Sequence, residues 1–275
     1  MNILTFDIEE WYVYGLYPKG GKAYFVPILD RYLKNILDLL DKYEAKATFF
    51  CLGELAFNYP EVVKLIAERG HDIGCHSDKH KLITQMNTDV FRLDTIEALD
   101  KIAQVTGQKV ISYRAPAFSI TEDNKWAFEI LAESGIKYDS SVFPANRSFG
   151  GFPSFQNYYP SIVKYNDIEI KEFPINIVNF LGKKIAFSGG GYFRLFPYFL
   201  LQKFTEASNY NMTYFHIRDF DKEQKVVLSF RYFKSYYGIK NAFSKFERYL
   251  NDFKFISIEQ ANKEMNWNQV DHIEL

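Results

Sequence analysis

The stretch Asp72-Ile73-Gly74-Cys75-His76-Ser77-Asp78-Lys79-His80 leads from an apolar, strand-like run directly into two histidines four residues apart. Imidazole is the commonest protein ligand for a divalent metal near neutral pH. Histidines at positions i and i+4 meet on one face wherever the chain turns helically. A metal held by two histidines needs a further ligand, usually a carboxylate, and Thr5-Phe6-Asp7-Ile8-Glu9-Glu10 offers candidates. The pattern predicts a metal site, although paired histidines can also cap helices or satisfy hydrogen bonds in a core.

Strands and helices alternate along the first half of the chain. Residues 3–6, 47–52, 71–75, 110–114 and 136–140 are strand-like, and helical patterns cover 27–43, 60–69, 88–106 and 122–134. Such alternation is typical of a parallel sheet. The polar residues that are candidates for catalysis or metal binding lie at the carboxyl ends of these strands, which is where the active sites of barrels lie. We therefore expect an α/β fold, specifically a distorted (β/α) barrel.

The second half begins with a different composition. Residues 144–197 are rich in Phe, Tyr, Pro, Gly and Asn, which predicts long loops and antiparallel excursions over one end of the barrel. Alternation resumes with a helix at 198–209, a strand at 212–217, a helix at 242–250 and a strand at 254–258. No linker composition interrupts the chain. We expect one catalytic domain over 1–275 with an aromatic-rich insertion at about 144–197.

Composition excludes several classes of function. The formal net charge is −1 and the basic residues are dispersed, so nothing argues for nucleic acid or an anionic membrane surface as a partner. Cys51 and Cys75 form no C-x-x-C pair and are predicted to be buried, reduced thiols. The first residues lack the basic and apolar regions of a signal peptide, so we expect no leader, and no apolar run reaches the roughly 18 residues of a membrane helix. We expect a cytoplasmic bacterial protein without stable membrane insertion.

Other polar residues are placed to take part in chemistry. Asp7 and Glu9 point to the same side of a strand, so one can bind metal while the other acts as a base. Arg114 ends a strand, where it either forms a surface salt bridge or fixes a carboxylate through a bidentate contact. His216 lies near the end of an apolar strand, as a core histidine or as a general acid in a metal pocket.

The order of these motifs resembles the polysaccharide deacetylases of carbohydrate esterase family four, over about 3–258. The motifs are Asp7-Ile8-Glu9, His76-Ser77-Asp78-Lys79-His80, Arg114-Ala115-Pro116, Asp139-Ser140-Ser141 and Phe215-His216. In addition, Ser188-Gly189-Gly190-Gly191-Tyr192-Phe193-Arg194 is similar to a stretch in a bacterial sub-branch tied to surface-polysaccharide gene clusters. The resemblance implies a distorted (β/α) barrel that hydrolyses an N-acetyl group from a sugar.

The resemblance also implies one divalent metal ion, expected to be Zn²⁺. Its ligands would be Glu9, His76 and His80. The usual opening motif of the family has two adjacent aspartates, whereas here one residue intervenes and the ligand is a glutamate. Glu10 is a rival ligand, although successive side chains of a strand alternate between its two sides, so Glu10 would point to the side opposite Asp7.

The catalytic roles implied by the resemblance involve five residues. Asp7 would be the base, anchored by Arg114, and His216 would be the acid. The backbone N–H of Ala117 would help to hold the oxyanion. Asp139 would orient either His216 or Arg114, and the sequence leaves both possibilities open.

Four side chains are candidates for contact with substrate. Phe143 occupies the position of a tryptophan that forms one wall of the site in the family. Trp11 either contacts the substrate or belongs to the core. Tyr192 and Arg194 follow the glycine run at 189–191, with Arg194 suited to a phosphate or carboxylate. The glycine run itself either brings backbone close to a sugar or phosphate, or forms a plain turn.

The function implied is metal-dependent N-deacetylation of a sugar in a cytosolic glycan-biosynthesis intermediate, for O-antigen, capsule or another surface polysaccharide. The sugar substrate would be linked to a nucleotide, a lipid or a glycan. Two alternatives remain. One is hydrolysis of another C–N bond, allantoinase-like or deformylase-like, and the other is a sugar-binding protein that has lost catalysis.

Overall fold

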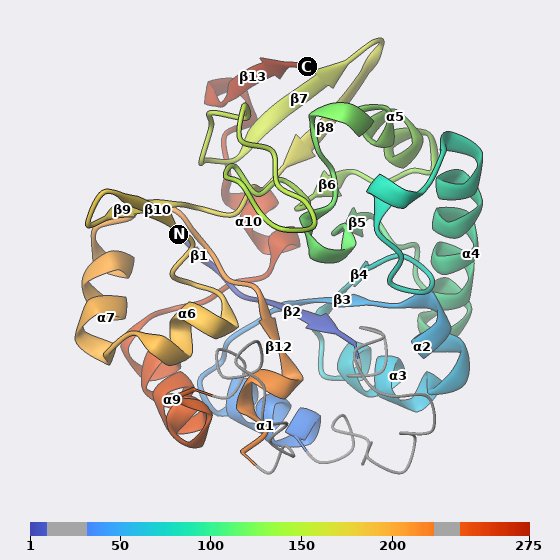
Figure 1. Cartoon of the computed structure of the whole chain (residues 1–275). Helices are drawn as coiled ribbons and strands as arrows, with labels where there is room; N and C mark the ends of the chain where they lie inside the picture. Colours follow the sequence, from blue (N-terminus) through green and yellow to red (C-terminus); the bar gives the residue numbers. More distant parts are fainter. Residues whose placement is uncertain (10–31, 223–236) are drawn as a thin grey trace.

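The computed structural model describes residues 1–9, 32–222 and 237–275. Its centre is a nine-stranded sheet in the order β12-β2-β3-β4-β5-β6-β8-β7-β13 (Figure 1). Neighbouring strands are parallel except for the antiparallel pair β7 and β8. The strands of this sheet are β2 (Thr5–Ile8), β3 (Thr48–Cys51), β4 (Asp72–Cys75), β5 (Ser112–Tyr113), β6 (Tyr138–Asp139), β7 (Ser161–Tyr165), β8 (Ile168–Glu172), β12 (Phe215–His216) and β13 (Asp271–Glu274).

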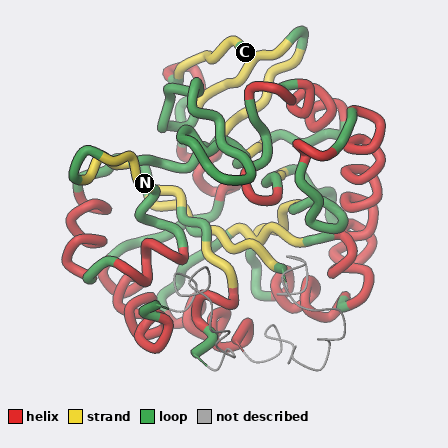
Figure 2. The backbone as a smooth tube through the Cα atoms, in the orientation of Figure 1, coloured by secondary structure: helices red, strands yellow, loops and turns green. Residues whose placement is uncertain are grey.

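Two small sheets and a set of helices complete the described fold. One small sheet pairs β1 (Asn2–Ile3) with β11 (Asn211–Met212), and the other pairs β9 (Val178–Phe180) with β10 (Lys183–Ile185). Figure 2 shows the helices around the outside of the strands. They are α1 (Lys34–Lys42), α2 (Gly53–Asn58), α3 (Pro60–Glu68), α4 (Thr88–Thr106), α5 (Trp126–Glu133), α6 (Gly190–Leu195), α7 (Tyr198–Glu206), α9 (Ala242–Asp252) and α10 (Ile258–Glu264).

The predicted fold class is confirmed: helices surround a central, mostly parallel sheet. Within the described ranges the end strands β12 and β13 are not hydrogen-bonded to each other, so the barrel-like sheet is open. Residues 144–197 contain two antiparallel pairs, β7 with β8 and β9 with β10. The antiparallel excursions therefore fall in the segment that the composition had marked.

The clearest differences from the prediction concern three strands. The strand expected at 254–258 is reduced to a single bridge from Ile3 to Ile256, because α10 begins at Ile258. The strand expected at 212–217 is divided into β11 and β12, and a 3₁₀ helix (Ile217–Phe220) follows. Strand β13 was not predicted, because its sequence Asp-His-Ile-Glu is polar and mostly exposed.

Local sequence explains the longest helix. Helix α4 spans the predicted residues, and the side chain of Asn87 accepts a hydrogen bond from the N–H of Val90 at its start. Gly107 ends the helix in the left-handed conformation, with φ of 67°. The same helix packs closely against α2, because Gly53 has no side chain to separate them.

The core contains many aromatic rings among its aliphatic side chains. Phe6 stacks on Phe49 with ring centroids 4.9 Å apart, and both rings are fully buried. Cys51 and Cys75 lie opposite each other on β3 and β4 as buried, free thiols, which confirms the prediction. Burial raises the pKa of both thiols. Among the described residues, no helix combines the length and apolarity that crossing a bilayer requires.

The close approach of α2 and α4 gives a prediction about stability. In Gly53→Ala the new Cβ would lie 2.6 Å from the Cα of Ala98, so the helices must separate. We expect a loss of about 1–3 kcal/mol in the free energy of unfolding, measured by urea denaturation. Gly191→Ala is the matched control, because a Cβ there meets nothing within 4 Å. Equal stability of the two variants would contradict this account of the packing.

Candidate active site

The predicted site residues lie at one edge of the sheet. Asp7 and Glu9 are at the end of β2, His76 follows β4, Arg114 follows β5, and His216 ends β12. These strands are parallel, so their carboxyl ends lie on the same side. The pairing of β12 with β2 sets His216 directly beside Asp7.

The two histidines meet through a loop and not through a helical turn. Ser77 and His80 both have left-handed backbone conformations, with φ of 70° and 57°. The N–H of His80 donates to Oγ of Ser77 at 3.0 Å and closes the loop. The ring centroids of His76 and His80 are thereby 5.1 Å apart. The helical turn assumed from the spacing was wrong, but the rings nonetheless lie side by side.

Glu9, His76 and His80 form a candidate metal centre. All three are buried, and one ligand atom from each lies within 4.8 Å of the others. Nε2 of His80 is 2.6 Å and Nε2 of His76 is 3.8 Å from Oε2 of Glu9. Glu10, the rival ligand, lies outside the described residues.

The tautomer of His76 fits metal binding. Its Nδ1 lies 2.7 Å from the carbonyl oxygen of Arg114, and a carbonyl can only accept, so Nδ1 carries the hydrogen. The lone pair of the neutral ring is then on Nε2, which faces Glu9. Burial lowers the pKa of His76 to about 4, so the ring is neutral at pH 7. A carboxylate and two imidazoles are a donor set that suits Zn²⁺.

The carboxylate of Glu9 lies among positive groups. Its Oε1 is 3.0 Å from Nε2 of His216 and 2.9 Å from Nη1 of Arg218. Burial alone would raise the pKa of Glu9, but His80, Arg218 and His216 hold it well below its usual value. Glu9 is therefore ionised at neutral pH, as a metal ligand must be.

Asp7 is held by a fully buried guanidinium. Nη1 of Arg114 donates to Oδ1 of Asp7 at 3.0 Å and to Oγ1 of Thr5 at 2.7 Å. Nε and Nη2 of Arg114 donate to the carbonyl and hydroxyl oxygens of Ser140. The bidentate contact with a carboxylate that the sequence suggested is therefore not formed, and Asp7 receives a single hydrogen bond from Arg114. Oδ2 of Asp7 lies 3.8 Å from Nε2 of His216.

His216 is oriented by an acid that sequence reasoning missed. Oδ2 of Asp219 accepts from the backbone N–H of His216 at 2.8 Å and lies 3.2 Å from its Nδ1. Burial and Arg218 lower the pKa of His216, but the carboxylates of Glu9 and Asp219 more than offset them and raise it to about 9. The spacing of three residues between His216 and Asp219 is the sequence signal that could have revealed this pair.

Asp139 does not contact His216. It accepts from Oγ of Ser141 at 2.6 Å and from the N–H of Ser141 at 3.0 Å. Its other neighbour is the buried Glu172, whose Oε1 accepts from the N–H of Val142. Burial and the nearby Asp139 raise the pKa of Glu172 well above its usual value, so Glu172 is the acid of this pair that is protonated at neutral pH. The two predicted partners of Asp139 were His216 and Arg114. Of these, Arg114 influences Asp139, because burial raises the pKa of that carboxyl and the positive charge of Arg114 acts to lower it.

The predicted substrate contacts lie in different surroundings. Arg194 is buried and pairs with the carboxylate of Asp219, and its predicted contact with a phosphate or carboxylate of the substrate stays a prediction. Phe143 is buried, with its ring 5.5 Å from that of Phe118. Tyr192 is exposed on α6 and stacks on Phe196. Trp11 lies outside the described residues.

The turn after Arg114 carries Ala117 in an uncommon conformation. Ala117 and Phe118 both have positive φ, of 52° and 56°. Above Phe118 lies the exposed guanidinium of Arg147, 5.0 Å from that ring and 4.5 Å from the ring of Phe143. Arg147 is a further cation near the site that the sequence pattern did not indicate.

The glycine run has a role other than the two proposed from sequence. A Cβ on Gly189 would lie 1.8 Å from the ring of Tyr214, and one on Gly190 would lie 1.9 Å from the carboxylate of Asp219. The missing side chains therefore allow α6 to pack against the acid that orients His216.

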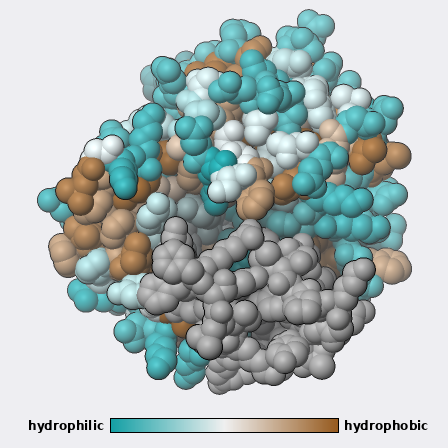
Figure 3. All heavy atoms as spheres, in the orientation of Figure 1, coloured by the Kyte–Doolittle hydropathy of each residue, from teal (hydrophilic) through white to brown (hydrophobic). Residues whose placement is uncertain are grey.

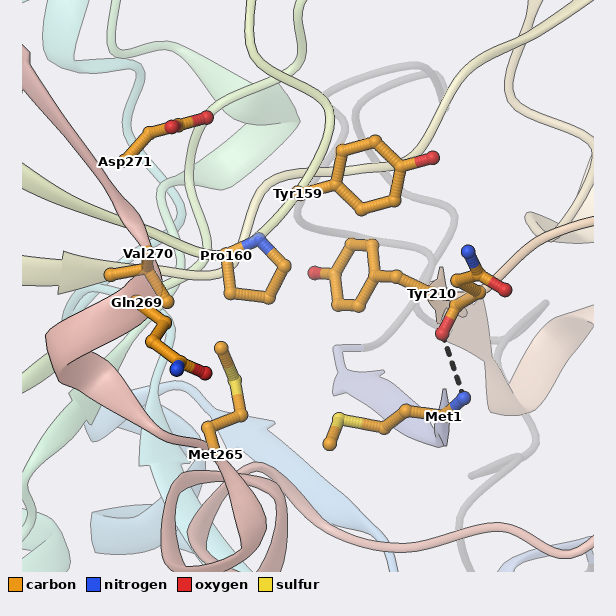
Figure 4. Close-up of a pocket in the computed structure, with 9 residues that line it drawn as sticks. Met1, Tyr159, Pro160, Tyr210, Met265, Gln269, Val270 and Asp271 are labelled. Carbon is orange, nitrogen blue, oxygen red and sulfur yellow. Dashed lines mark hydrogen bonds between the residues drawn. The ribbon is translucent and has the colours of Figure 1, made fainter.

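One hollow in the surface lies away from these residues. A pocket of about 310 Å³ is lined by residues that include Met1, Tyr159, Tyr210 and Met265 (Figure 4). The N-terminal amine of Met1 donates to the carbonyl of Asn209 at its rim. Its lining contains no histidine, so this pocket lacks the metal-binding chemistry found at the carboxyl edge of the sheet.

Fold and site together define a barrel-like α/β protein with a candidate metal centre at the carboxyl edge of its strands. Residues 3–138 match the family model described as polysaccharide deacetylase. Residues 140–263 match the model of a domain of unknown function, DUF3473. The first half of the chain is thus similar to the polysaccharide deacetylases, and the second half is similar to DUF3473.

Individual relatives cover part of the chain. A peptidoglycan-N-acetylglucosamine deacetylase of Bacillus cereus is 34% identical over 130 residues, which are 45% of this chain and 47% of the relative. A peptidoglycan deacetylase of Helicobacter pylori is 27% identical over 110 residues, 40% of this chain and 36% of the relative. The chain thus spans less than half the length of these curated relatives.

Solved structures support the fold over nearly the whole chain. A crystal structure from Mycobacterium smegmatis, assigned to the polysaccharide deacetylases, superposes with a TM-score of 0.68 at 17% identity, covering 98% of this chain and 90% of its own. A pseudoenzyme of carbohydrate esterase family four from Bacillus anthracis superposes with a TM-score of 0.52 at 14% identity, covering 100% of this chain and 69% of its own. At these identities the likeness concerns the fold alone.

The acid pair of Asp139 and Glu172 gives a prediction about pH. Glu172 takes up a proton on folding, so its contribution to stability is present below the ordinary pKa of about 4.3 and is lost as pH rises through its raised, folded-state pKa. Glu172→Gln keeps an oxygen that can accept from the N–H of Val142 and does not titrate. We expect its free energy of unfolding, relative to the unaltered protein, to increase between pH 5 and pH 8 in urea denaturation.

The matched control for that measurement is Glu169→Gln on the same strand. Glu169 is exposed, and its hydrogen bond and ion pair with Lys164 lower its pKa, so this variant should not gain stability as pH rises. A constant difference between Glu172→Gln and the unaltered protein across the pH range would contradict the assignment of a neutral Glu172.

Proposed function

We propose that this protein is a metal-dependent carbohydrate deacetylase that removes an N-acetyl group from a sugar in a cytosolic glycan-biosynthesis intermediate. The observation that carries the proposal is the placement of Asp7 and His216 beside the buried group of Glu9, His76 and His80. An acid and a base beside a metal-binding group are the parts that hydrolysis of an amide needs. The match of residues 3–138 to the polysaccharide deacetylase model supports a sugar amide as the substrate.

Glu9, His76 and His80 would hold the cation, with Zn²⁺ as the expected ion. When bound, such an ion supplies Lewis-acid polarisation of the acetyl carbonyl and lowers the pKa of water. The chemistry of the three donors supports this assignment. Glu9 is ionised, and His76 presents its Nε2 lone pair toward it.

Asp7 acts as the base that takes a proton from the attacking water. Arg114 occupies Oδ1 of Asp7, while Oδ2 lies on the side of His216 and the candidate metal centre. The hydrogen bond from Arg114 to Oδ1 leaves Oδ2 as the oxygen of Asp7 that can receive the proton. Burial of the pair removes competing water and fixes the direction of the carboxylate.

His216 acts as the acid that returns a proton to the departing amine. Asp219 sets the ring orientation through Nδ1, which leaves Nε2 facing Asp7 and Glu9. Proton transfer by a positioned side chain contributes roughly 10²–10⁴-fold to a rate. The N–H of Ala117 stabilises the oxyanion, a contribution of about 3–4 kcal/mol for one well-placed donor.

The substrate and its compartment belong to the same proposal. The two relatives compared above are named for peptidoglycan, so a peptidoglycan N-acetyl sugar is the second candidate substrate. A cytosolic surface-polysaccharide intermediate is supported by the free thiols of Cys51 and Cys75, which suit a reducing compartment. Acetate release from nucleotide-linked, lipid-linked and polymeric N-acetyl sugars separates these substrates, and hydrolysis of small cyclic amides or formamides in their place would refute the proposal.

The structural likeness to a pseudoenzyme makes loss of catalysis a specific alternative. Against it stands the complete group of metal-binding and proton-transferring residues at one edge of the sheet. A protein that binds zinc and sugar but releases no acetate from any N-acetyl sugar would be the sugar-binding protein of this alternative.

The division of roles between Asp7 and the metal-binding residues is testable with two variants. His80→Ala should lose bound zinc and turnover together. Asp7→Asn should retain zinc while kcat falls by roughly 10²–10⁴-fold, because only the base is removed. Zinc is measured by mass spectrometry after dialysis, and turnover by acetate release. His272→Ala, which removes an exposed histidine on β13, is the control. Loss of zinc in Asp7→Asn would show that Asp7 is itself a ligand.

The orientation of His216 by Asp219 gives a further prediction. Asp219→Asn leaves the zinc-binding residues in place, so zinc content should not change. We expect kcat to fall by roughly 10- to 100-fold with little change in KM, because substrate binding does not need the orientation of His216. Asp167→Asn, at an exposed turn, is the control. An unchanged kcat, or a rise in KM alone, would exclude a positioning role for Asp219.

A further inference from the structure

One face of the molecule combines exposed apolar side chains with lysines. It consists of the β9–β10 turn, the end of α6 and the start of α7, and we call it the apolar–basic face. The exposed fractions are 86% for Leu181, 64% for Phe199 and 50% for Leu195. Figure 3 shows hydrophobic residues gathered over this part of the surface, on the side where Figure 1 places α7 and the β9–β10 pair. Contiguous exposed apolar area of this kind marks interaction sites.

The position of Leu181 is costly for folding. Leu181 and Gly182 form the two-residue turn between β9 and β10, and both have positive φ, of 49° and 76°. Such a turn favours Asn, Asp or Gly at its first position, because a branched side chain is strained in the left-handed region. A leucine there gains almost no burial in return. Neither the turn nor the core requires it, which points to a role outside the folded monomer.

The apolar–basic face is continuous and firmly supported. Beneath the exposed residues lie the half-buried rings of Phe180, Phe196 and Phe204, with centroid distances of 5.5 to 5.9 Å. Tyr192 stacks on Phe196 at 5.7 Å and extends the apolar area along α6. The exposed residues are therefore held by a packed aromatic layer and act as one surface.

The charge of this segment differs from that of the whole chain. Residues 173–205 contain four basic residues and no acidic one, which leaves 29 basic and 34 acidic residues, a net charge of −5, for the rest. Arg194 is paired internally with Asp219, but Lys183, Lys184 and Lys203 are exposed. The net charge of −1 over the whole chain conceals this local basic character.

We propose that the apolar–basic face docks onto an anionic lipid bilayer. Leu181, Leu195 and Phe199 enter the boundary between headgroups and acyl chains, and Lys183, Lys184 and Lys203 bind lipid phosphates. Apolar side chains flanked by lysines are the combination that holds a protein on a membrane surface without crossing it. Anionic lipids supply the negative charge that the lysines need.

Docking would bring the candidate active site to the membrane. Helix α6 borders the apolar–basic face, and its Gly190 lies against Asp219, the acid that orients His216. A lipid-linked sugar would then reach the site along the bilayer. This choice of sugar carrier rests on the proposed function, whereas the docking itself does not.

The test is vesicle flotation with the full-length protein. The protein should float with vesicles that contain phosphatidylglycerol and stay behind with phosphatidylcholine alone. Raising the salt to 1 M, where the Debye length is about 3 Å, should weaken the binding. Lys183→Gln/Lys184→Gln should lower the affinity by about fivefold for each lysine removed.

Leu181→Asn provides the sharpest variant, because asparagine suits the left-handed turn and should leave the melting temperature equal or higher. We expect it to lower vesicle affinity by about tenfold, the factor that corresponds to withdrawing one leucine side chain from an apolar phase. Leu93→Asn is the matched control, since Leu93 is 62% exposed on α4, at the opposite side of the molecule in Figure 1.

Three results would overturn the proposal. They are absence of flotation, equal flotation with neutral vesicles, and equal loss of affinity in Leu181→Asn and Leu93→Asn. Saturable binding of an acidic protein to this face without flotation would show that the face serves a protein partner instead. Acetate release from a water-soluble sugar substrate is measured in parallel. Unchanged release by Leu181→Asn, together with lost flotation, separates docking from catalysis.

Discussion

The buried guanidinium of Arg114 is the interaction on which the site depends. Its donors join β2, through Asp7 and Thr5, to the residue after β6, Ser140. Its backbone carbonyl fixes the tautomer of His76. A buried cation is costly unless every donor is satisfied, and here carboxylate, hydroxyl and carbonyl oxygens share the task while the ring of Phe50 covers one face at 4.4 Å. One side chain thus sets the direction of the base and, through its own backbone, the chemistry of a metal ligand.

Around this ion pair the buried charges are arranged in adjoining groups of opposite sign. Glu9 lies among His80, His216 and Arg218, and Asp219 lies between His216 and Arg194. Each carboxylate is shared by more than one cation, so removing any one member leaves an uncompensated charge in a region of low dielectric. Asp139 and Glu172 are also buried side by side, but they do not place two negative charges together, because Glu172 is neutral. The site is therefore an electrostatic unit whose members constrain each other's protonation.

The sequence predicted the elements that follow from short-range patterns. Strand–helix alternation located the sheet, and the i and i+2 spacing placed Asp7 and Glu9 together. The three-residue spacing of His216 and Asp219 was visible in the sequence, but choosing Asp219 over Asp139 from it required knowing how the chain turns after β12. The polar strand β13 was also missed, since its pairing with β7 depends on long-range contact and not on its own pattern. The loop that joins the paired histidines uses left-handed residues that no hydrophobic period reveals.

The glycines at 189–191 connect the site to the apolar–basic face. At Gly190 the absence of a side chain lets α6 approach Asp219, and at Gly189 it lets the chain pass against Tyr214. Helix α6 then continues to Leu195, where its outer surface is apolar. The backbone that holds the orienting acid is therefore the same backbone that presents this surface.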